Sequence, residues 1–319
     1  MKRLKLIVIL FLILVSTVNA KEKKFRFALV PKNANSDFFI QAYYGCMKAA
    51  KELKNIECIY ASAGEANPRI QVSTLQKLLK NKVDGIALSV IDSDFLLQSG
   101  VLKEAQNLGI PIITFDSDLS VAVLQQYPKL RLSYIGTNNF QFGQALGKTL
   151  VKARPQGGEV CIQSGWKNSS NLNERIRGIR SILLNTKDKK VLQNRVTNKK
   201  WTESIRCPLY NNDNNKRALF QLTMMIERID AFVAVGGWAQ YSKNYQSQIR
   251  PFKKALLENK KTLIMGDTQP IQIELLKQKS SFYNVGQNPF KMGEESVHTL
   301  YKIKTNKKNN FFKKQPCCE

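Results

Sequence analysis

The sequence is poor in the residues that most catalytic and metal sites require. It has a single histidine, His298, and none of its six cysteines forms a C-x-x-C pair. A zinc site and a thioredoxin-like centre are therefore not indicated, because both depend on closely spaced ligands. His298 falls in the last predicted helix, away from strand ends, and we assign it to the surface or to packing. No nucleophile elbow or phosphate-binding loop occurs, and "GTNNFQFGQALG" (136–147) is too loose for a dinucleotide fingerprint.

Long apolar runs are also missing after the first twenty residues. Residues 1–20, "MKRLKLIVILFLILVSTVNA", have cationic residues, then an apolar run, then a small-residue end, which is the pattern of a secretory signal peptide. No later stretch approaches the roughly 18 to 20 apolar residues of a membrane helix. We therefore expect a mature chain that begins at Lys21, does not span the membrane and resides in the periplasm. No cysteine follows the predicted cut, so we expect no lipid anchor.

Acidic residues are scarce: the chain has 24 Asp and Glu against 50 Lys and Arg, a formal net charge of +26. Clustered lysines would indicate a polyanionic partner. Here they are scattered along predicted helices and loops together with many asparagines, as in "KKVLQNRVTNKK" (189–200). We therefore expect a solvated basic surface and no nucleic-acid partner.

The six cysteines permit disulfides in an exported chain. Two fall in each half of the sequence and two at its end: Cys46 and Cys58, Cys161 and Cys207, and Cys317 and Cys318. Pairing within each half is the most economical arrangement. Other pairings remain open at this point.

Short β-prone runs alternate with amphipathic stretches of helical period along the whole mature chain. This alternation predicts parallel sheets covered by helices and connected by right-handed crossovers. A chain of about 300 mature residues also exceeds one compact core, so two domains are expected. The predicted strands lie at 25–30, 56–61, 85–90, 111–116, 131–136, 158–163, 231–236, 262–267 and 282–287. The predicted helices lie at 38–53, 68–81, 94–108, 140–153, 172–185, 213–228, 241–258, 270–278 and 289–303.

Polar and aromatic residues follow these strands directly, where α/β sheets bind ligands. The run "IPIITFDSDLS" (110–120) passes from a buried strand into Asp116 and Asp118, and "TLIMGDT" (262–268) ends in the same way at Asp267. These acids are candidates for catalysis, for a metal, or for accepting hydroxyl groups of a bound molecule.

Several segments together resemble the ribose-binding type of periplasmic substrate-binding protein. In the first half they are "ALVPKNANSDFFIQAYYGCMKAAKEL", "VDGIALSVIDSD", "GIPIITFDSD" and "YIGTNNFQFGQALGKTL". In the second half they are "NLNERIRGIRSIL", "DAFVAVGGWAQ" and "GDTQPIQIELLKQKSSFYNVGQNPFKMGEESV". The resemblance implies an α/β fold of two Rossmann-like lobes with parallel sheets, joined by a three-segment hinge (periplasmic binding protein type I).

The resemblance also implies a set of ligand-binding residues. The carboxylates would accept ligand hydroxyls, the guanidinium would donate to oxygens, and the aromatic rings would pack on C–H faces of a sugar. The set is Phe38, Phe39, Asp116, Arg175, Trp201, Trp238, Asp267 and Gln287. Lys32 departs from the family pattern and points away from a neutral pentose, towards an anionic or differently shaped ligand. Gly236 stands where the family has asparagine, so Trp238 or a water has to replace that contact.

Simpler readings of the same residues remain open. Asp116 is also suited to capping the next segment, both tryptophans to inter-helix packing, and Phe39 to the core. The acids of the two D-x-D pairs, Asp92, Asp94 and Asp118, lack the spacing of a calcium loop and are better explained as helix caps or solvated acids. We expect no metal and no cofactor. A paired-carboxylate hydrolase using Asp116 and Asp267 is the enzymatic alternative, and we expect a protein that is not an enzyme.

The expected domains are a signal peptide at 1–20, a first lobe at 25–136 with 288–305, and a second lobe at 137–287 with 306–319. The expected function is capture of a monosaccharide or similar polyol between the lobes and its delivery to an ABC permease by a monomeric protein. A sensory receptor of the same fold, signalling to a histidine kinase or chemoreceptor, is the alternative. A repressor effector domain is disfavoured by the signal peptide and by the lack of a helix-turn-helix before Phe25.

Overall fold

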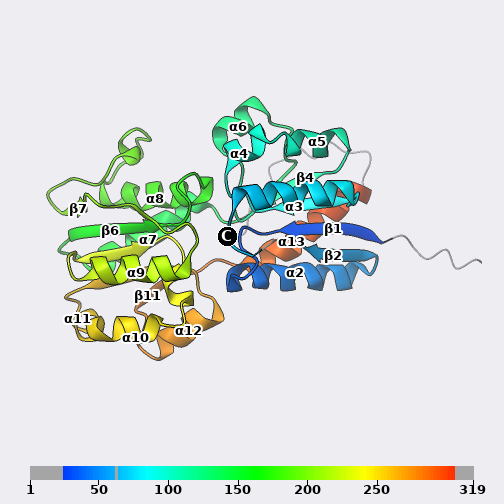
Figure 1. Cartoon of the computed structure of the whole chain (residues 1–319). Coiled ribbons are helices and arrows are strands. Elements are labelled where there is room, and N and C mark those ends of the chain that lie inside the picture. The colour runs from blue at the N-terminus through cyan, green and yellow to red at the C-terminus, as the bar shows by residue number, and fades with distance from the viewer. Residues whose placement is uncertain (1–23, 62–63, 306–319) are drawn as a thin grey trace, which may run out of the picture.

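The computed structural model describes residues 24–61 and 64–305, and these form two α/β lobes side by side (Figure 1). The predicted signal peptide and the last fourteen residues, with Cys317 and Cys318, lie outside this range. One lobe contains a five-stranded sheet and the other a six-stranded sheet, and every strand pair is parallel. The predicted fold class is confirmed. No helix within the described residues combines the length and apolar character needed to cross a bilayer.

The first lobe has the strand order β2-β1-β3-β4-β5. Its strands are β1 (Phe25–Val30), β2 (Ile56–Tyr60), β3 (Gly85–Leu88), β4 (Ile112–Phe115) and β5 (Tyr134–Ile135). Its helices are α2 (Asp37–Leu53), α3 (Pro68–Lys80), α4 (Ser93–Gln98), α5 (Val101–Asn107), α6 (Val121–Gln126) and α13 (Pro289–Thr305). Alternate residues of one strand face opposite ways. Ala28 accordingly packs in a core with α3, α4, α5 and α6, whereas Phe27 packs in a core with α2 and α13.

The second lobe has the strand order β11-β10-β9-β6-β7, and β8 pairs with the far end of β6. Its strands are β6 (Gly158–Ser164), β7 (Trp201–Glu203), β8 (Leu209–Tyr210), β9 (Ala231–Ala234), β10 (Thr262–Gly266) and β11 (Tyr283–Val285). Its helices are α7 (Asn139–Ala153), α8 (Ser170–Leu183), α9 (Asn215–Ile226), α10 (Tyr245–Ile249), α11 (Lys253–Leu257) and α12 (Pro270–Lys277). Short 3-10 turns occupy Val191–Gln193, Trp238–Tyr241 and Arg250–Phe252.

In each lobe, one pair of helices packs backbone to backbone. A Cβ atom added to Gly293 of α13 would meet Ala42 O of α2, and one added to Gly143 of α7 would meet Arg175 O of α8 at 2.1 Å. Any side chain at these glycines would push the helices apart. α7 and α13 each follow a passage of the chain from one lobe to the other, at 136–138 and 286–288. The predicted third passage, near 306, lies outside the described residues.

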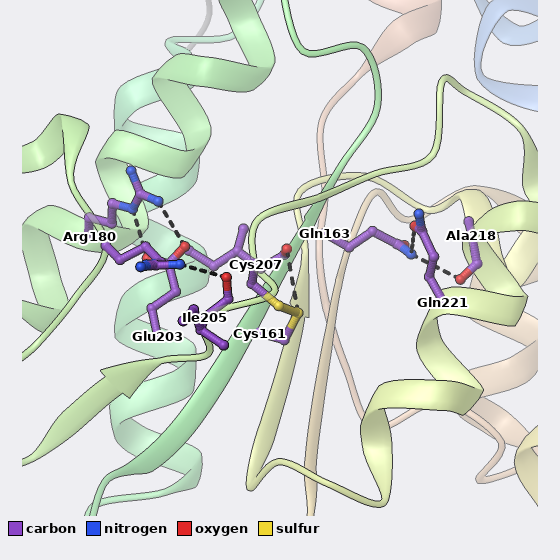
Figure 2. The surroundings of a disulfide bond; sticks show 10 residues. Cys161, Gln163, Arg180, Glu203, Ile205, Cys207, Ala218 and Gln221 are labelled. Atoms are coloured by element: carbon purple, nitrogen blue, oxygen red, sulfur yellow. Dashed lines mark hydrogen bonds and ion pairs between the residues drawn. A yellow bond between two sulfur atoms is a disulfide. The ribbon is translucent and has the colours of Figure 1, made fainter.

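Both predicted disulfides of the mature halves are present. Cys46–Cys58 joins α2 to β2, and Cys161–Cys207 joins β6 to the segment that precedes β8. Figure 2 shows the second bond beside the buried pair of Arg180 and Glu203.

Three predicted elements were wrong in detail. The helix expected at 94–108 is two helices, because Gly100 adopts a left-handed φ of 76° between α4 and α5. The helix expected at 241–258 is broken into α10, a 3-10 turn containing Pro251, and α11. The polar connection after α8 contains β7 and β8, which are too short to show alternation in the sequence.

Candidate ligand-binding site

A cavity lies between the lobes, at the carboxyl ends of both sheets. Its volume, counted as room for the centres of water molecules, is about 60 Å³, space for about four to six waters. Seven of the eight predicted site residues line it; Trp201 does not. The lining residues are Lys32, Asn33, Ser36, Phe38, Phe39, Asp116, Asn171, Leu172, Arg175, Asp213, Asn215, Gly236, Trp238, Tyr241, Asp267 and Gln287.

Asp116 is the buried acid that the first lobe places in the cavity. It follows β4 with a left-handed φ of 57°, a conformation that aspartate tolerates better than most residues. Ser89, just after β3, donates to its Oδ2 at 2.8 Å. The Lys32 ammonium lies 3.9 Å from the same oxygen. The carboxylate is thus fixed in the cavity wall, with acceptor capacity to spare.

Asp267 occupies the equivalent place in the second lobe. It follows β10, also has a left-handed φ (72°) and is equally buried, at 6% exposure for each acid. Its Oδ2 accepts from the Gly237 amide at 3.1 Å and from the Tyr241 hydroxyl at 3.2 Å, and its Oδ1 accepts from Gln287 at 2.7 Å. Burial raises the pKa of this carboxyl above its usual value, although Arg175 and the amide of Gln287 oppose the shift.

Arg175 is held in place by the protein's own acceptors. Its Nε donates to Asn139 Oδ1 at 2.8 Å, one terminal nitrogen donates to Val235 O at 2.9 Å, and the other to Gln287 Oε1 at 3.0 Å. The guanidinium carbon also lies 4.4 Å from the ring centre of Phe142. Asn139 of α7, which does not itself line the cavity, therefore positions a cavity residue.

Phe38 and Phe39 begin α2 and form one aromatic corner of the cavity. Their rings meet edge to face at 5.1 Å, and Phe39 makes the same kind of contact with Phe115 of β4 at 6.0 Å. Both side chains are buried, at 6% exposure. Phe39 thus belongs to the core and lines the cavity at once.

The two tryptophans of the predicted set lie in different places. Trp238 lines the cavity, and its ring lies so close to Gly236 that an added Cβ there would come within 2.8 Å of it. The indole of Trp238 thus occupies the space that a side chain at position 236 would need. Trp201 is in β7, buried to 2% exposure in the core beneath α7 and α8. Its expected position over the ligand was wrong, because the segment around it is an edge strand and not a loop.

Two acids of the D-x-D pairs, Asp92 and Asp118, have structural partners, and Asp94 is exposed. Asp92 caps α4 by accepting from the amides of Asp94 and Phe95. Asp118 accepts two hydrogen bonds from Arg131, at 2.6 and 3.0 Å, and one from Thr114. Both acids therefore serve helix capping and ion pairing in this structure.

Nine lining residues were not in the predicted set, and those with an ionisable, amide or phenol side chain deep in the cavity include Lys32, Asn171, Asp213 and Tyr241. Asp213 follows β8, and the missed strand hid the fact that this acid also stands at a strand end. Burial raises the pKa of Asp213 to about 6, opposed by the nearby Lys32 ammonium. Burial likewise lowers the pKa of Lys32, opposed by Asp116 and Asp213.

The lobes touch each other across the cavity. Lys32 Nζ of the first lobe donates to Ser169 Oγ at 2.7 Å and to Asn171 Oδ1 at 3.2 Å in the second. Ser170 Oγ donates to Asp118 O at 2.6 Å. These contacts make the present arrangement a closed one, and Lys32 is buried to 5% exposure in it.

Sequence comparisons agree with the geometry. The family model for the periplasmic binding protein domain matches residues 27–308. The D-ribose/D-allose-binding protein of Pseudomonas aeruginosa is 26% identical over 171 residues, which cover 53% of this chain and 53% of that protein. The xylose/arabinose-binding protein of Sulfolobus acidocaldarius is 25% identical over 151 residues, covering 46% of this chain and 36% of that protein. The matched region is about half of the first relative and less of the second.

Solved structures give the same result over a greater length. A solute-binding protein of an ABC transporter from Burkholderia graminis, in complex with D-arabinose, matches with a TM-score of 0.70 and 26% identity, covering 90% of this chain and 91% of that one. One from Agrobacterium vitis, bound with α-D-tagatopyranose, has a TM-score of 0.76 at 21% identity, covering 90% and 91%. The chain belongs to the periplasmic binding protein family, with the two parallel-sheet lobes of type I.

Proposed function

We propose that this protein captures a monosaccharide or similar polyol between its lobes in the periplasm and delivers it to an ABC permease. The observation that carries the proposal is the placement of Asp116 and Asp267 at equivalent strand ends on opposite walls of one closed cavity. Ionised carboxylates accept hydrogen bonds from adjacent hydroxyls, and the Phe38–Phe39 corner offers an apolar wall to C–H groups.

The volume supports a small ligand. A molecule that displaces about four to six waters has the size of a single sugar ring rather than of a chain of sugars. The sugars for which these relatives are named, or with which they were crystallised, are likewise monosaccharides.

The mechanism follows from the shared walls. Lobes that flex at 136–138 and 286–288 bring both carboxylates onto one ligand only when closed, so the ligand shifts the population towards the closed form. The closed form then presents a joined surface to a permease. The protein works in this scheme as a monomer, with no chemical step, no cofactor and no metal.

The test is a thermal-shift screen of the mature protein against pentoses, hexoses and polyols. Because stabilisation grows with the logarithm of concentration over dissociation constant, a ligand at about 100 times its Kd adds about 2.7 kcal/mol to the free energy of unfolding. At least one member should raise the melting temperature, and Asp116→Ala should remove that response. A panel without any response would contradict the proposal.

A further inference from the structure

The cavity contains one acid of the second lobe that has no counterpart in the first lobe. Asp213 lies between β8 and α9 in the second lobe, whereas the paired strand-end acids are Asp116 and Asp267. Its Oδ2 atom is inaccessible to solvent and has no hydrogen-bond partner among the described residues. A buried carboxylate oxygen without a donor is costly, so a donor is expected from whatever fills the cavity.

The cations of the cavity do not supply that donor. Arg175 donates its hydrogen bonds to Asn139, a backbone carbonyl and Gln287, and none goes to a carboxylate. Lys32 donates to Ser169 and Asn171 and stands 3.9 Å from Asp116. Asp213 therefore lacks an ion-pair partner within the described residues.

The charges in the lining can be summed. Three carboxylates, of Asp116, Asp213 and Asp267, face two cations, of Lys32 and Arg175, which leaves one excess negative charge when all are ionised (2 − 3 = −1). An anionic ligand would bring a second uncompensated negative charge into the space between the lobes. Like charges placed together in such a space cost several kcal/mol.

We propose that Asp213 is a third ligand-binding carboxylate, which accepts a hydroxyl of the bound sugar or polyol, and that its charge makes the cavity select uncharged ligands over sugar acids and sugar phosphates. This inference rests on the proposed function. It also assigns Lys32 a different role from the one its sequence suggested: the ammonium holds the lobes together and balances acids, and no anion is needed to explain it.

The backbone makes a clean variant available. Asp213 has a left-handed φ of 55°, which asparagine adopts as readily as aspartate. Asp213→Asn therefore preserves the turn and one oxygen acceptor while removing the charge. Asp188→Asn is the matched control, because it removes a carboxylate from an exposed turn of the same lobe, away from the cavity.

The experiment is calorimetric titration with neutral aldoses and polyols and with the phosphates and uronic or aldonic acids of the same sugars. For the neutral sugar that binds wild type most tightly, Asp213→Asn should weaken binding about 10- to 100-fold, the worth of a hydrogen bond to a charged group. Asp188→Asn should leave it unchanged. In wild type the neutral sugar should bind at least about 100-fold more tightly than its own acid or phosphate, and this ratio should shrink in Asp213→Asn.

Two results would overturn the inference while sparing the proposed function: an unchanged affinity in Asp213→Asn, or a sugar acid or phosphate that binds wild type more tightly than its neutral parent. The second result needs no variant and therefore stands even if Asp213→Asn fails to fold, which its melting temperature without ligand would reveal. No binding by any member of either class would overturn the inference together with the proposed function.

Discussion

The two lobes build the same wall of the cavity with different supports. Asp116 and Asp267 share the strand end, the left-handed turn and the degree of burial. Asp116 is held by a serine hydroxyl and faces an ammonium, whereas Asp267 is held by a backbone amide, a phenol and an amide side chain. The backbone, which is alike in the two lobes, therefore places the acids. The neighbouring side chains, which differ between the lobes, determine the electrostatic surroundings of each acid and the hydrogen bonds that remain for a ligand.

The lobes also differ in how charge contributes to stability. In the second lobe, Arg180 and Glu203 form a bidentate pair at 2.8 and 2.9 Å, with side-chain exposures of 6% and 0%. In the first lobe, Arg26 and Glu57 pair at 3.5 Å with exposures of 40% and 53%. Breaking these two ion pairs should give the largest difference between the lobes in the free energy of unfolding.

Glu203→Gln should lower the free energy of unfolding by about 3–5 kcal/mol, because Arg180 is left buried without a counter-charge. Glu57→Gln, the matched control, should cost less than about 1 kcal/mol, since both partners are solvated. Urea unfolding followed by circular dichroism measures both. Equal losses would show that burial does not separate the two pairs as the structure implies.

Removing each disulfide should give a smaller contrast. Cys161–Cys207 closes a loop of 46 residues and Cys46–Cys58 one of 12. By loop entropy, the double alanine variants should lose about 4 and about 3 kcal/mol respectively. Denaturant midpoints under oxidising conditions test the order. A greater loss from the shorter loop would mean that local packing of the sulfur atoms outweighs chain entropy.

The paired acids should contribute comparably to ligand binding. Asp116→Asn and Asp267→Asn should each weaken the affinity for the ligand found in the screen by about 10- to 100-fold, as expected for hydrogen bonds to a charged acceptor. Titration calorimetry gives both values, and Asp118→Asn serves as a control because that acid pairs with Arg131. A loss of affinity in only one of the two variants would show that the two acids do not have equivalent roles.

The last prediction is a pH dependence carried by the second lobe. Burial raises the pKa of Asp213 to about 6 from 3.8, while Lys32, Asp116, Arg175 and Trp238 are the groups that act on it. Between about pH 4 and pH 6 the folded ligand-free protein therefore holds a proton that the unfolded chain has lost, and the Asp213 contribution to stability falls as pH rises.

Asp213→Asn lacks this contribution, so the stability of the variant relative to wild type should increase from pH 4 to pH 6 and then level off. Urea unfolding of both proteins without ligand at several pH values measures the difference between their free energies of unfolding. The contributions of the other titrating groups are common to both proteins and cancel in this difference. A constant difference across this range would place Asp213 in a more solvated environment than the structure describes.

Much of the fold was readable because parallel strands buried on both faces appear as continuous apolar runs. Both sheets and most helices follow from that pattern. The most economical pairing of the cysteines, within each half of the sequence, is the one observed. The predictions that failed concern single elements. Gly100 ends a helix that the apolar periodicity alone would continue. The strands β7 and β8 are held by pairing with β6, a long-range interaction that leaves no signal in the local sequence.

The same division holds for the site. Asp116 and Asp267 could be placed at the cavity from the sequence because strand ends mark the ligand side of such sheets, and the family resemblance added Arg175 and Gln287. Asp213 was not among the predicted residues because β8, the strand that precedes it, was not predicted. Trp201 was expected in a loop because its own strand, β7, was not predicted either. Asn139 gave no local signal, since its bond to the guanidinium depends on how two helices cross.

The crossing of α13 over α2 has a consequence for biosynthesis. The first lobe obtains one of its covering helices from Pro289–Thr305, close to the end of the chain, and Gly293 must reach the backbone of α2 for that layer to close (Figure 1). Those residues follow every element of the second lobe in the chain, so during synthesis the core of the first lobe cannot gain its final layer until the second lobe has been translated.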